Sequence, residues 1–163
     1  MNAKSAPMKS YRKILWTAGK TFLIIYFSSL TKLHTTCDNI VSLLNEQCSS
    51  AHYVMCKNCI GKYHSEAPES AKKRITSSLQ DGNNGLMILA SVSFGMGIDN
   101  PAVRQVIHRG CPSDLEAYTQ EIGRASRNQG EGHAIMYVNG HDTSRRHVTK
   151  EMKAFCVNRT ECR

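Results

Sequence analysis

Residues Phe22-Leu-Ile-Ile-Tyr-Phe27 form an unbroken run of apolar and aromatic side chains. β-branched and aromatic residues favour strands, and a strand without polar alternation has no face that suits water. Such strands occur in parallel sheets that carry helices on both faces. The run is far shorter than the roughly 20 apolar residues of a membrane-spanning helix. It therefore predicts a buried strand of an α/β domain.

Strand-like and helix-like patterns alternate along the rest of the chain. Further short apolar runs occupy residues 86–90, 103–108 and 134–138. Helical spacing of apolar residues predicts helices over residues 34–47, over a segment opened by Pro68, over residues 113–126, and over a last segment carrying Val148, Met152 and Phe155. The second helix repeats Ala71, Ile75 and Leu79 every four positions. This alternation predicts an α/β fold with a mostly parallel sheet flanked by helices.

Composition limits the classes of partner and compartment. The chain has 163 residues and a net charge of +8, a basic balance that points to a polyanionic partner. Its start lacks the apolar middle of a signal peptide, and no segment has the length of a membrane span. The seven cysteines are spread over the predicted elements, so a reduced, intracellular protein is favoured over a disulfide framework. A basic transit peptide at the start remains an alternative.

The predicted helix over residues 113–126 separates its residue types by side. At about 100° per residue the apolar positions fall in one narrow sector: Leu115, Tyr118, Ile122 and Ala125. The opposite side presents Gln120, Arg124 and Arg127. A guanidinium matches the oxygens of a phosphate group with a planar fork of donors. The pattern fits a phosphate-facing side, but from periodicity alone a solvated face on a surface helix is the favoured interpretation.

The residues that follow the run at 86–90 have a loop-like composition, Ser91-Val-Ser-Phe-Gly-Met-Gly-Ile-Asp99. Ligands of parallel sheets bind outside the carboxyl ends of the strands. Gly95 and Gly97 allow a sharp turn and a close approach to another molecule, and Asp99 can order the loop or accept from a cation. An ordinary strand-to-loop turn is the alternative.

Cys56 and Cys59 have the spacing of half a zinc site. Three more potential ligands lie near them in the sequence, Cys48, His52 and His64. A second pair at the same spacing is absent from the sequence, so reduced cysteines in a loop insertion are the favoured interpretation.

Several segments together resemble the second motor domain of RecQ-type DNA helicases. ASVSFGMGIDNPAVRQVIH is similar to the fifth helicase motif of that family, and DLEAYTQEIGRASRNQGEGHAIMY to the sixth. YHSEAPESAKKRI resembles the segment between the fourth and fifth motifs, and KTFLIIYFSS the opening strand. FCVNRTECR resembles the entry to the zinc-binding subdomain of Bloom-type members. The resemblance covers residues 19–163 and departs from the family at Ser91, at Ser126, at residues 128–129 and in the long stretch 48–60.

The resemblance implies three regions and a RecA-like fold. Residues 1–18 are expected to be a basic flexible lead-in, residues 19–140 the helicase C-terminal RecA-like domain, and residues 141–163 a helix entering a zinc-binding subdomain. Cys162 is then the first ligand of an incomplete zinc site, and Zn²⁺ is expected only in a longer chain.

The family binds ATP with Mg²⁺ in a cleft between two RecA-like domains, and the first domain holds most of the nucleotide. By resemblance Arg127 is the arginine finger, Arg124 contacts phosphate or couples the cleft to DNA, and Gln120 orients water or phosphate. The implied ATP-binding residues are Gly97, Asp99, Gln120, Gly123, Arg124 and Arg127. The chain itself contains neither Gly-x-x-x-x-Gly-Lys-Ser/Thr nor Asp-Glu-x-His, so alone it is expected not to hydrolyse ATP.

The implied activity is 3′-to-5′ DNA unwinding in the nucleus, with the cytoplasm as the alternative compartment. The partners are single-stranded and junction DNA together with a first RecA-like domain or a longer chain, and no membrane is expected. The implied DNA-binding residues are His64, Ser65, Ser91, Ser93, Phe94 and Gly95. Two alternatives remain, a non-catalytic nucleic-acid-binding or regulatory fragment derived from a helicase, and a small zinc-binding protein built on residues 48–64.

Overall fold

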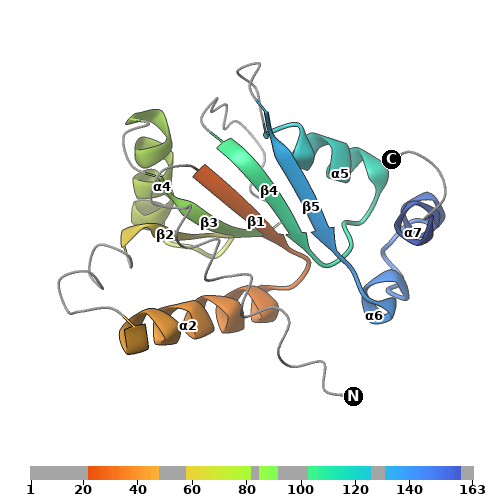
Figure 1. Cartoon of the computed structure of the whole chain (residues 1–163), viewed down its shortest axis with the longest axis horizontal. Helices are drawn as coiled ribbons and strands as arrows, with labels where there is room; N and C mark the ends of the chain where they lie inside the picture. The colour runs from red at the N-terminus through yellow and green to blue at the C-terminus, as the bar shows by residue number, and fades with distance from the viewer. Residues whose placement is uncertain (1–21, 48–57, 82–84, 92–102, 126–130, 159–163) are drawn as a thin grey trace.

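The computed structural model describes residues 22–47, 58–81, 85–91, 103–125 and 131–158. Its centre is a five-stranded sheet in the order β2-β3-β1-β4-β5 (Figure 1). All four strand pairings are parallel. The strands are β1 (Phe22–Phe27), β2 (Ile60–Tyr63), β3 (Met87–Ser91), β4 (Val103–Arg109) and β5 (His133–Tyr137). The predicted α/β fold with a parallel sheet between helices is confirmed.

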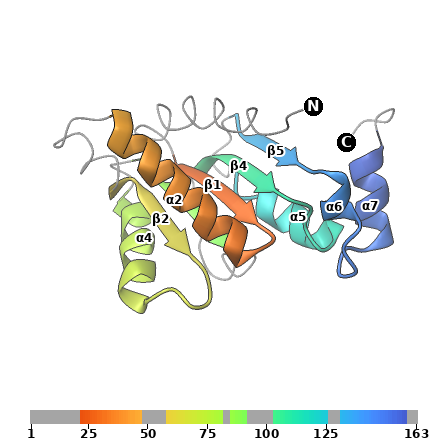
Figure 2. The ribbon, with the colours of Figure 1, turned by 90° about the horizontal axis from the view of Figure 1, so that it is seen from below.

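Helices cover the two faces of the sheet, as Figure 2 shows from the side of α2. The helix α2 (Leu30–Gln47) lies on one face, and α4 (Glu69–Asp81) and α5 (Leu115–Ile122) lie on the other. Because β1 is central, its side chains enter both layers in turn, and all six of its residues are buried. Leu23, Ile25 and Phe27 pack in the cluster under α2. Ile24 and Tyr26 pack in the other cluster, with residues of α4.

The chain after β5 forms two short helices beyond the edge of the sheet, α6 (Gly140–Thr143) and α7 (Lys150–Val157). Val148 and Met152 are buried there together with Cys111, which follows β4. Tyr118 of α5 packs against the same small cluster. The segment that follows β5 is thus joined to α5 by a small hydrophobic cluster separate from the two clusters that flank the sheet.

The predicted and observed elements differ most where local pattern is weak. Strand β2 is absent from the prediction because Gly61 and Lys62 interrupt its apolar pattern, yet Ile60 and Gly61 pair with β3. A Cβ at Gly61 would meet Ile75 Cδ1 at 2.8 Å, so this glycine lets α4 lie close to the sheet. The helix α2 begins at Leu30, four residues before the predicted start at residue 34. The helix α6 has four residues, too few to show a helical period.

Within the parts of the chain that the structure describes, no helix combines the length and apolar character that a membrane span requires.

Candidate functional site

The start of α5 is fixed by a side-chain cap. Asp114 accepts a hydrogen bond from the Ala117 backbone amide at 2.7 Å and another from the Ser113 hydroxyl at 2.7 Å. These bonds, the first most of all, hold the pKa of the Asp114 carboxyl below its ordinary value. A carboxylate at this position also meets the partial positive charge of the helix N-terminus.

The end of α5 differs from the predicted helix over residues 113–126. The helix stops at Ile122 with Gly123 as its cap. Beyond the cap the amides bond three residues back, Arg124 N to Glu121 O at 3.3 Å and Ala125 N to Ile122 O at 2.9 Å. Such tight turns advance by about 120° per residue instead of about 100°. A helical projection therefore fails beyond Gly123.

This change of direction overturns the predicted grouping of Gln120 with Arg124 on a solvated side. Gln120 is exposed, and its amide donates to Glu116 Oε1 at 3.3 Å. Arg124 is instead buried, with 9% of its surface exposed, and Glu121 is buried with 7%. The predicted core stripe is only half-buried at Leu115, Tyr118 and Ile122. Arg127 lies outside the described residues, so its side of the helix and its role remain predictions.

A polar network joins the end of α5 to the sheet. His108 Nε2 of β4 lies 2.7 Å from Glu121 Oε2, and both side chains are buried. The Tyr26 ring of β1 stacks on His108 with a centroid distance of 5.3 Å and an interplanar angle of 16°. The Arg124 guanidinium hydrogen-bonds the Tyr26 side chain, although burial outweighs this contact and raises the pKa of Tyr26 above its ordinary value.

The network buries an acidic side chain, Glu121, and a basic one, Arg124. A buried carboxylate or guanidinium is costly unless hydrogen bonds and a counter-charge accompany it. Glu121 has His108 as its hydrogen-bond partner, and Arg124 bonds Tyr26, whose ring lies on His108. The turn of residues 123–125 is therefore anchored to the neighbouring strands β1 and β4. Gly123, an implied ATP-binding residue, is exposed in this turn, whereas Gly97 and Asp99 lie outside the described residues.

The implied DNA-binding residues that are described lie at the carboxyl ends of β2 and β3. Ser91 is the last residue of β3, and His64 follows β2, whose Tyr63 pairs with Ala90. His64 is 7% exposed, its ring meets that of His34 of α2 edge-on with a centroid distance of 5.1 Å, and its pKa is lowered mainly by burial. Ser65 is exposed. The fold thus brings these three residues to one edge, while Ser93, Phe94 and Gly95 lie outside the described part.

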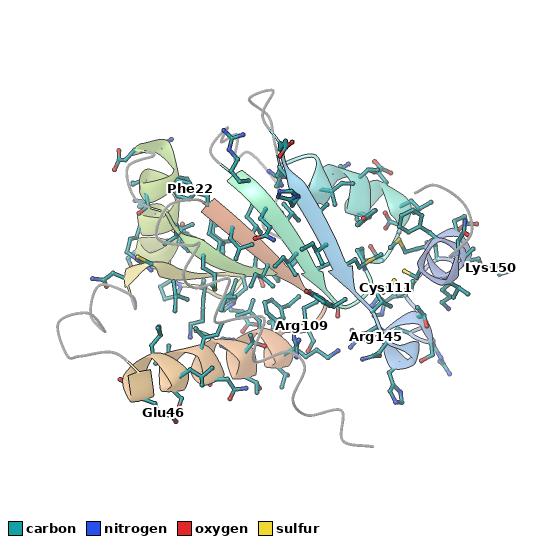
Figure 3. The ribbon with its side chains drawn as sticks, viewed as in Figure 1. Phe22, Glu46, Arg109, Cys111, Arg145 and Lys150 are labelled. Carbon is teal, nitrogen blue, oxygen red and sulfur yellow. The ribbon has the colours of Figure 1, made fainter. Side chains whose placement is uncertain are left out.

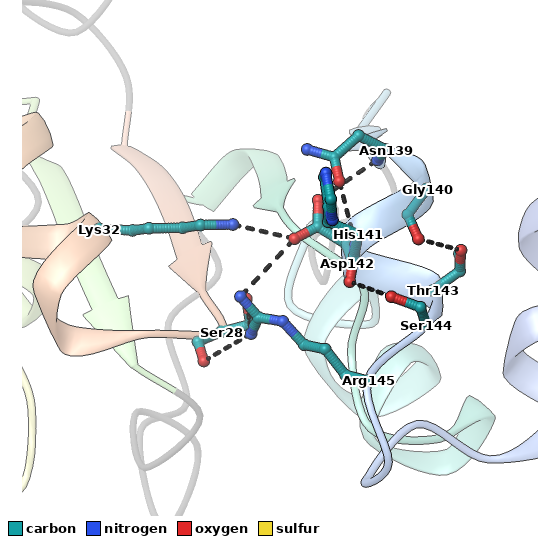
Figure 4. Close-up of polar contacts among 9 residues, drawn as sticks. All are labelled: Ser28, Lys32, Asn139, Gly140, His141, Asp142, Thr143, Ser144 and Arg145. Carbon is teal, nitrogen blue, oxygen red and sulfur yellow. Dashed lines mark hydrogen bonds and ion pairs between the residues drawn. The ribbon is translucent and has the colours of Figure 1, made fainter.

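A second polar network, which the sequence did not reveal, lies at the carboxyl end of β1 (Figure 4). Lys32 Nζ is 2.9 Å from Asp142 Oδ1, and Arg145 Nη2 is 3.8 Å from the same oxygen. Arg145 Nη1 donates to Ser28 Oγ at 3.0 Å and to the Ser28 carbonyl at 3.3 Å. We call these four residues the β1–α6 clamp. The contacts of Lys32 with Asp142 and of Ser28 with Arg145 join residues 110 and 117 positions apart, so no local pattern signals them.

The described residues contain no cluster of three or more His, Cys, Asp or Glu side chains suited to a metal ion. Of the sequence-predicted ligands, Cys59 and His64 are described, whereas Cys48, His52, Cys56 and Cys162 fall in undescribed ranges. The zinc alternatives therefore remain predictions.

Comparison with known proteins agrees with this fold and these motifs. The family model "Helicase conserved C-terminal domain" matches residues 8–129. The ATP-dependent DNA helicase hus2/rqh1 of Schizosaccharomyces pombe is 33% identical over 119 residues, which cover 62% of this chain and 9% of that protein. ATP-dependent DNA helicase Q1 of Mus musculus is 32% identical over 114 residues, covering 63% of this chain and 17% of the relative. The chain thus spans only a small part of the relatives' length.

Solved structures agree on the fold. The helicase MrfA bound to DNA aligns with a TM-score of 0.67 at 20% identity, covering 83% of this chain and 18% of that one. Domain 2 of the DEAD-box helicase Mss116p bound to an RNA duplex aligns with a TM-score of 0.60 at 17% identity, covering 79% and 46%. Because the family model matches most of its length, the chain belongs to the helicase conserved C-terminal domain family, and its curated relatives include RecQ-type DNA helicases.

Proposed function

We propose that this chain acts as the second motor domain of a RecQ-type, ATP-dependent 3′-to-5′ DNA helicase. In this role it completes an ATP cleft whose phosphate loop belongs to a first RecA-like domain, and it contacts DNA along the carboxyl edge of its sheet. The observation that carries the proposal is the anchoring of Arg124. A buried arginine tied to Tyr26 and set beside the His108–Glu121 pair fixes the turn from which the sixth-motif sequence continues toward Arg127.

In the proposed ATP cleft the two domains have different roles. ATP with Mg²⁺ is held mainly by the first domain, and Arg127 stabilises the charge that develops on the γ-phosphoryl oxygens. An arginine in this role contributes a factor on the order of 10³ to 10⁵ in rate. Gln120 is exposed at the end of α5, which leaves its amide able to orient water or a phosphate oxygen. Gly97 and Asp99 complete the proposed ATP-facing residues.

DNA binding is proposed through His64, Ser65, Ser91 and the segment of residues 93–95. The net charge of +8 and the position of the described residues at one sheet edge support it. We propose a nuclear location and a zinc-binding subdomain that begins at Cys162 in a longer chain. The alternative function is a nucleic-acid-binding module without catalysis, favoured for the chain alone because the sequence holds neither a phosphate loop nor Asp-Glu-x-His.

A reconstituted motor tests the proposal. The chain is fused to the first motor domain of a RecQ-type helicase, and ATP hydrolysis is measured with and without single-stranded DNA. The expected result is DNA-stimulated turnover that falls by about 10³ or more in Arg127→Ala and is poorly restored by Arg127→Lys, because a point charge cannot replace the planar fork. A folded fusion that binds DNA and never hydrolyses ATP would instead favour the non-catalytic module.

A further inference from the structure

A cavity of about 440 Å³ lies between α2 and the carboxyl ends of β4 and β5, beside the β1–α6 clamp. One wall is a row of polar side chains on α2, Thr31, Thr35 and Asn39, spaced four residues apart and all exposed. At about 1.5 Å per residue this row is about 12 Å long. The opposite wall carries Arg109, which Figure 3 labels near the end of β4, and Tyr137.

The charges around the cavity favour an anion. Its one acidic residue, Asp142, is 3% exposed, and its oxygens accept from Lys32 Nζ at 2.9 Å and from the Asn139 backbone amide at 3.3 Å. Arg145 lies behind it, 3.8 Å from Oδ1. Lys32 and Arg109 both line the cavity, so its cations outnumber its single, already neutralised carboxylate. The Lys32 side chain is 40% exposed, and an ammonium group can donate to a carboxylate and a further acceptor together.

Hydroxyl and amide donors beside lysine and arginine are the groups that contact phosphates in nucleic-acid complexes. Tyr137 adds an aromatic surface at the same place, and it is 50% exposed, one of two large hydrophobic side chains left open in the described residues. Proteins that hold single strands without sequence preference pair a basic groove with aromatic platforms on which bases stack. Both parts are present here within one cavity.

We propose that this cavity binds a segment of single-stranded nucleic acid, with backbone phosphates along the α2 row near Lys32 and Arg109 and one base stacked on Tyr137. This inference rests on the nucleic-acid binding of the proposed function, and it adds a contact site on the face covered by α2. None of the residues in it belongs to the implied DNA-binding set. The cavity lies at the same carboxyl edge of the sheet as Ser91 and next to Ser28. A single strand of nucleic acid can therefore continue from the cavity to the implied DNA-binding residue Ser91.

The test measures binding of a fluorescein-labelled oligo(dT), and in parallel of oligo(U), to the full chain by anisotropy at several salt concentrations. Tyr137→Ala is expected to weaken binding about tenfold, as loss of one stacking platform does. Tyr137→Phe keeps the ring and should bind like the parent. Thr35→Glu places a negative charge in the cavity without touching the clamp and should weaken binding and make its salt slope shallower. Ser77→Glu, an equal charge change at an exposed position of α4 on the other face, is the matched control.

A second readout locates the strand directly. Oligonucleotides carrying 5-iodouracil are photocrosslinked to the parent chain, and the adduct is mapped by peptide mass spectrometry. An adduct at Tyr137 supports the site. Undiminished binding by Tyr137→Ala and Thr35→Glu, with adducts elsewhere, overturns it and leaves the proposed function standing. A parent chain that shows no salt-sensitive binding to either oligonucleotide contradicts nucleic-acid binding itself, and the site with it. Equal losses in Thr35→Glu and Ser77→Glu, with no loss in Tyr137→Ala, would reduce the effect to overall charge and reject the site.

Discussion

Glu121 Oε2 lies 2.7 Å from His108 Nε2, and this buried contact fixes α5 to strand β4 of the sheet. The residue that follows the helix by two positions, Arg124, reaches Tyr26 on the next strand. The helix α5 and the turn after it are thereby held to the sheet by two contacts, Glu121 with His108 and Arg124 with Tyr26. In a motor domain, that rigidity would serve the arginine motif, because transition-state stabilisation depends on donors that are already in place.

Removing the carboxylate should test how much the network stabilises the fold. Glu121→Ala leaves His108 Nε2 buried without this hydrogen-bond partner, and a buried polar group that loses its partner costs about 1 to 3 kcal/mol. Glu116→Ala removes the same charge from an exposed position of the same helix and should cost less than about 1 kcal/mol. Urea unfolding of both variants gives the two free energies. Similar losses in the free energy of unfolding for the two variants would show that the buried contact contributes little.

The close approach of Gly110 to Ser28 predicts an asymmetry between two glycines. Gly110 has a φ of 117°, and a Cβ there would lie 2.5 Å from Ser28 Oγ, inside the β1–α6 clamp. Gly110→Ala should therefore destabilise the chain by about 1 to 3 kcal/mol or more. At Gly140, the first residue of α6, a Cβ would meet nothing within 4 Å, so Gly140→Ala should be neutral or slightly stabilising. Thermal melts of the two glycine variants and the parent measure the difference. Equal melting temperatures for Gly110→Ala and Gly140→Ala would contradict the close contact between Gly110 and Ser28.

The cap of α5 predicts a specific dependence on pH. The pKa of Asp114 is lowered in the folded state by the hydrogen bonds from Ala117 and Ser113, so the stability it supplies is complete above the unfolded value of about 3.9 and is lost as pH falls through the folded value. Asp114→Ala should cost about 1 kcal/mol at pH 7. The difference from the parent should shrink below about pH 4. Unfolding curves at a series of pH values measure it, and a gap that widens in acid would contradict the assignment.

Cys111 should resist alkylation in the folded chain. Its thiol is 1% exposed, and burial, aided by the Cys156 thiol whose sulfur lies 3.5 Å away, raises the pKa of Cys111 to about 12. The reactive thiolate is therefore scarce at pH 8. With reductant present, iodoacetamide labelling followed by peptide mass spectrometry should find Cys111 unmodified in the native chain and modified in denaturant. Rapid native labelling of Cys111 would show that α7 does not cover it.

Every strand except β2, and the family, could be predicted from the sequence because their signals are local. An apolar run such as Phe22–Phe27 is buried whichever neighbours it acquires, and the positions of Ile75 and Leu79 repeat with the period of a helix that has one buried side. The motifs at residues 91–99 and 120–127 identify the family without any knowledge of strand order. Residues of this kind meet the same environment in every parallel α/β arrangement.

The networks depend on which strands are neighbours, and a local period carries no such information. Lys32 meets Asp142 across 110 residues because the order β1-β4-β5 brings three carboxyl ends to one edge, where α6 folds back on β1. The burial of Arg124 depends in turn on where α5 stops, and on Tyr26 being available on the neighbouring strand. The helical projection predicted that Arg124 would be exposed to solvent, because a projection of one helix contains no partner from another strand. Packing reversed that assignment, since a buried charge is tolerated only where the fold supplies hydrogen bonds and a counter-charge.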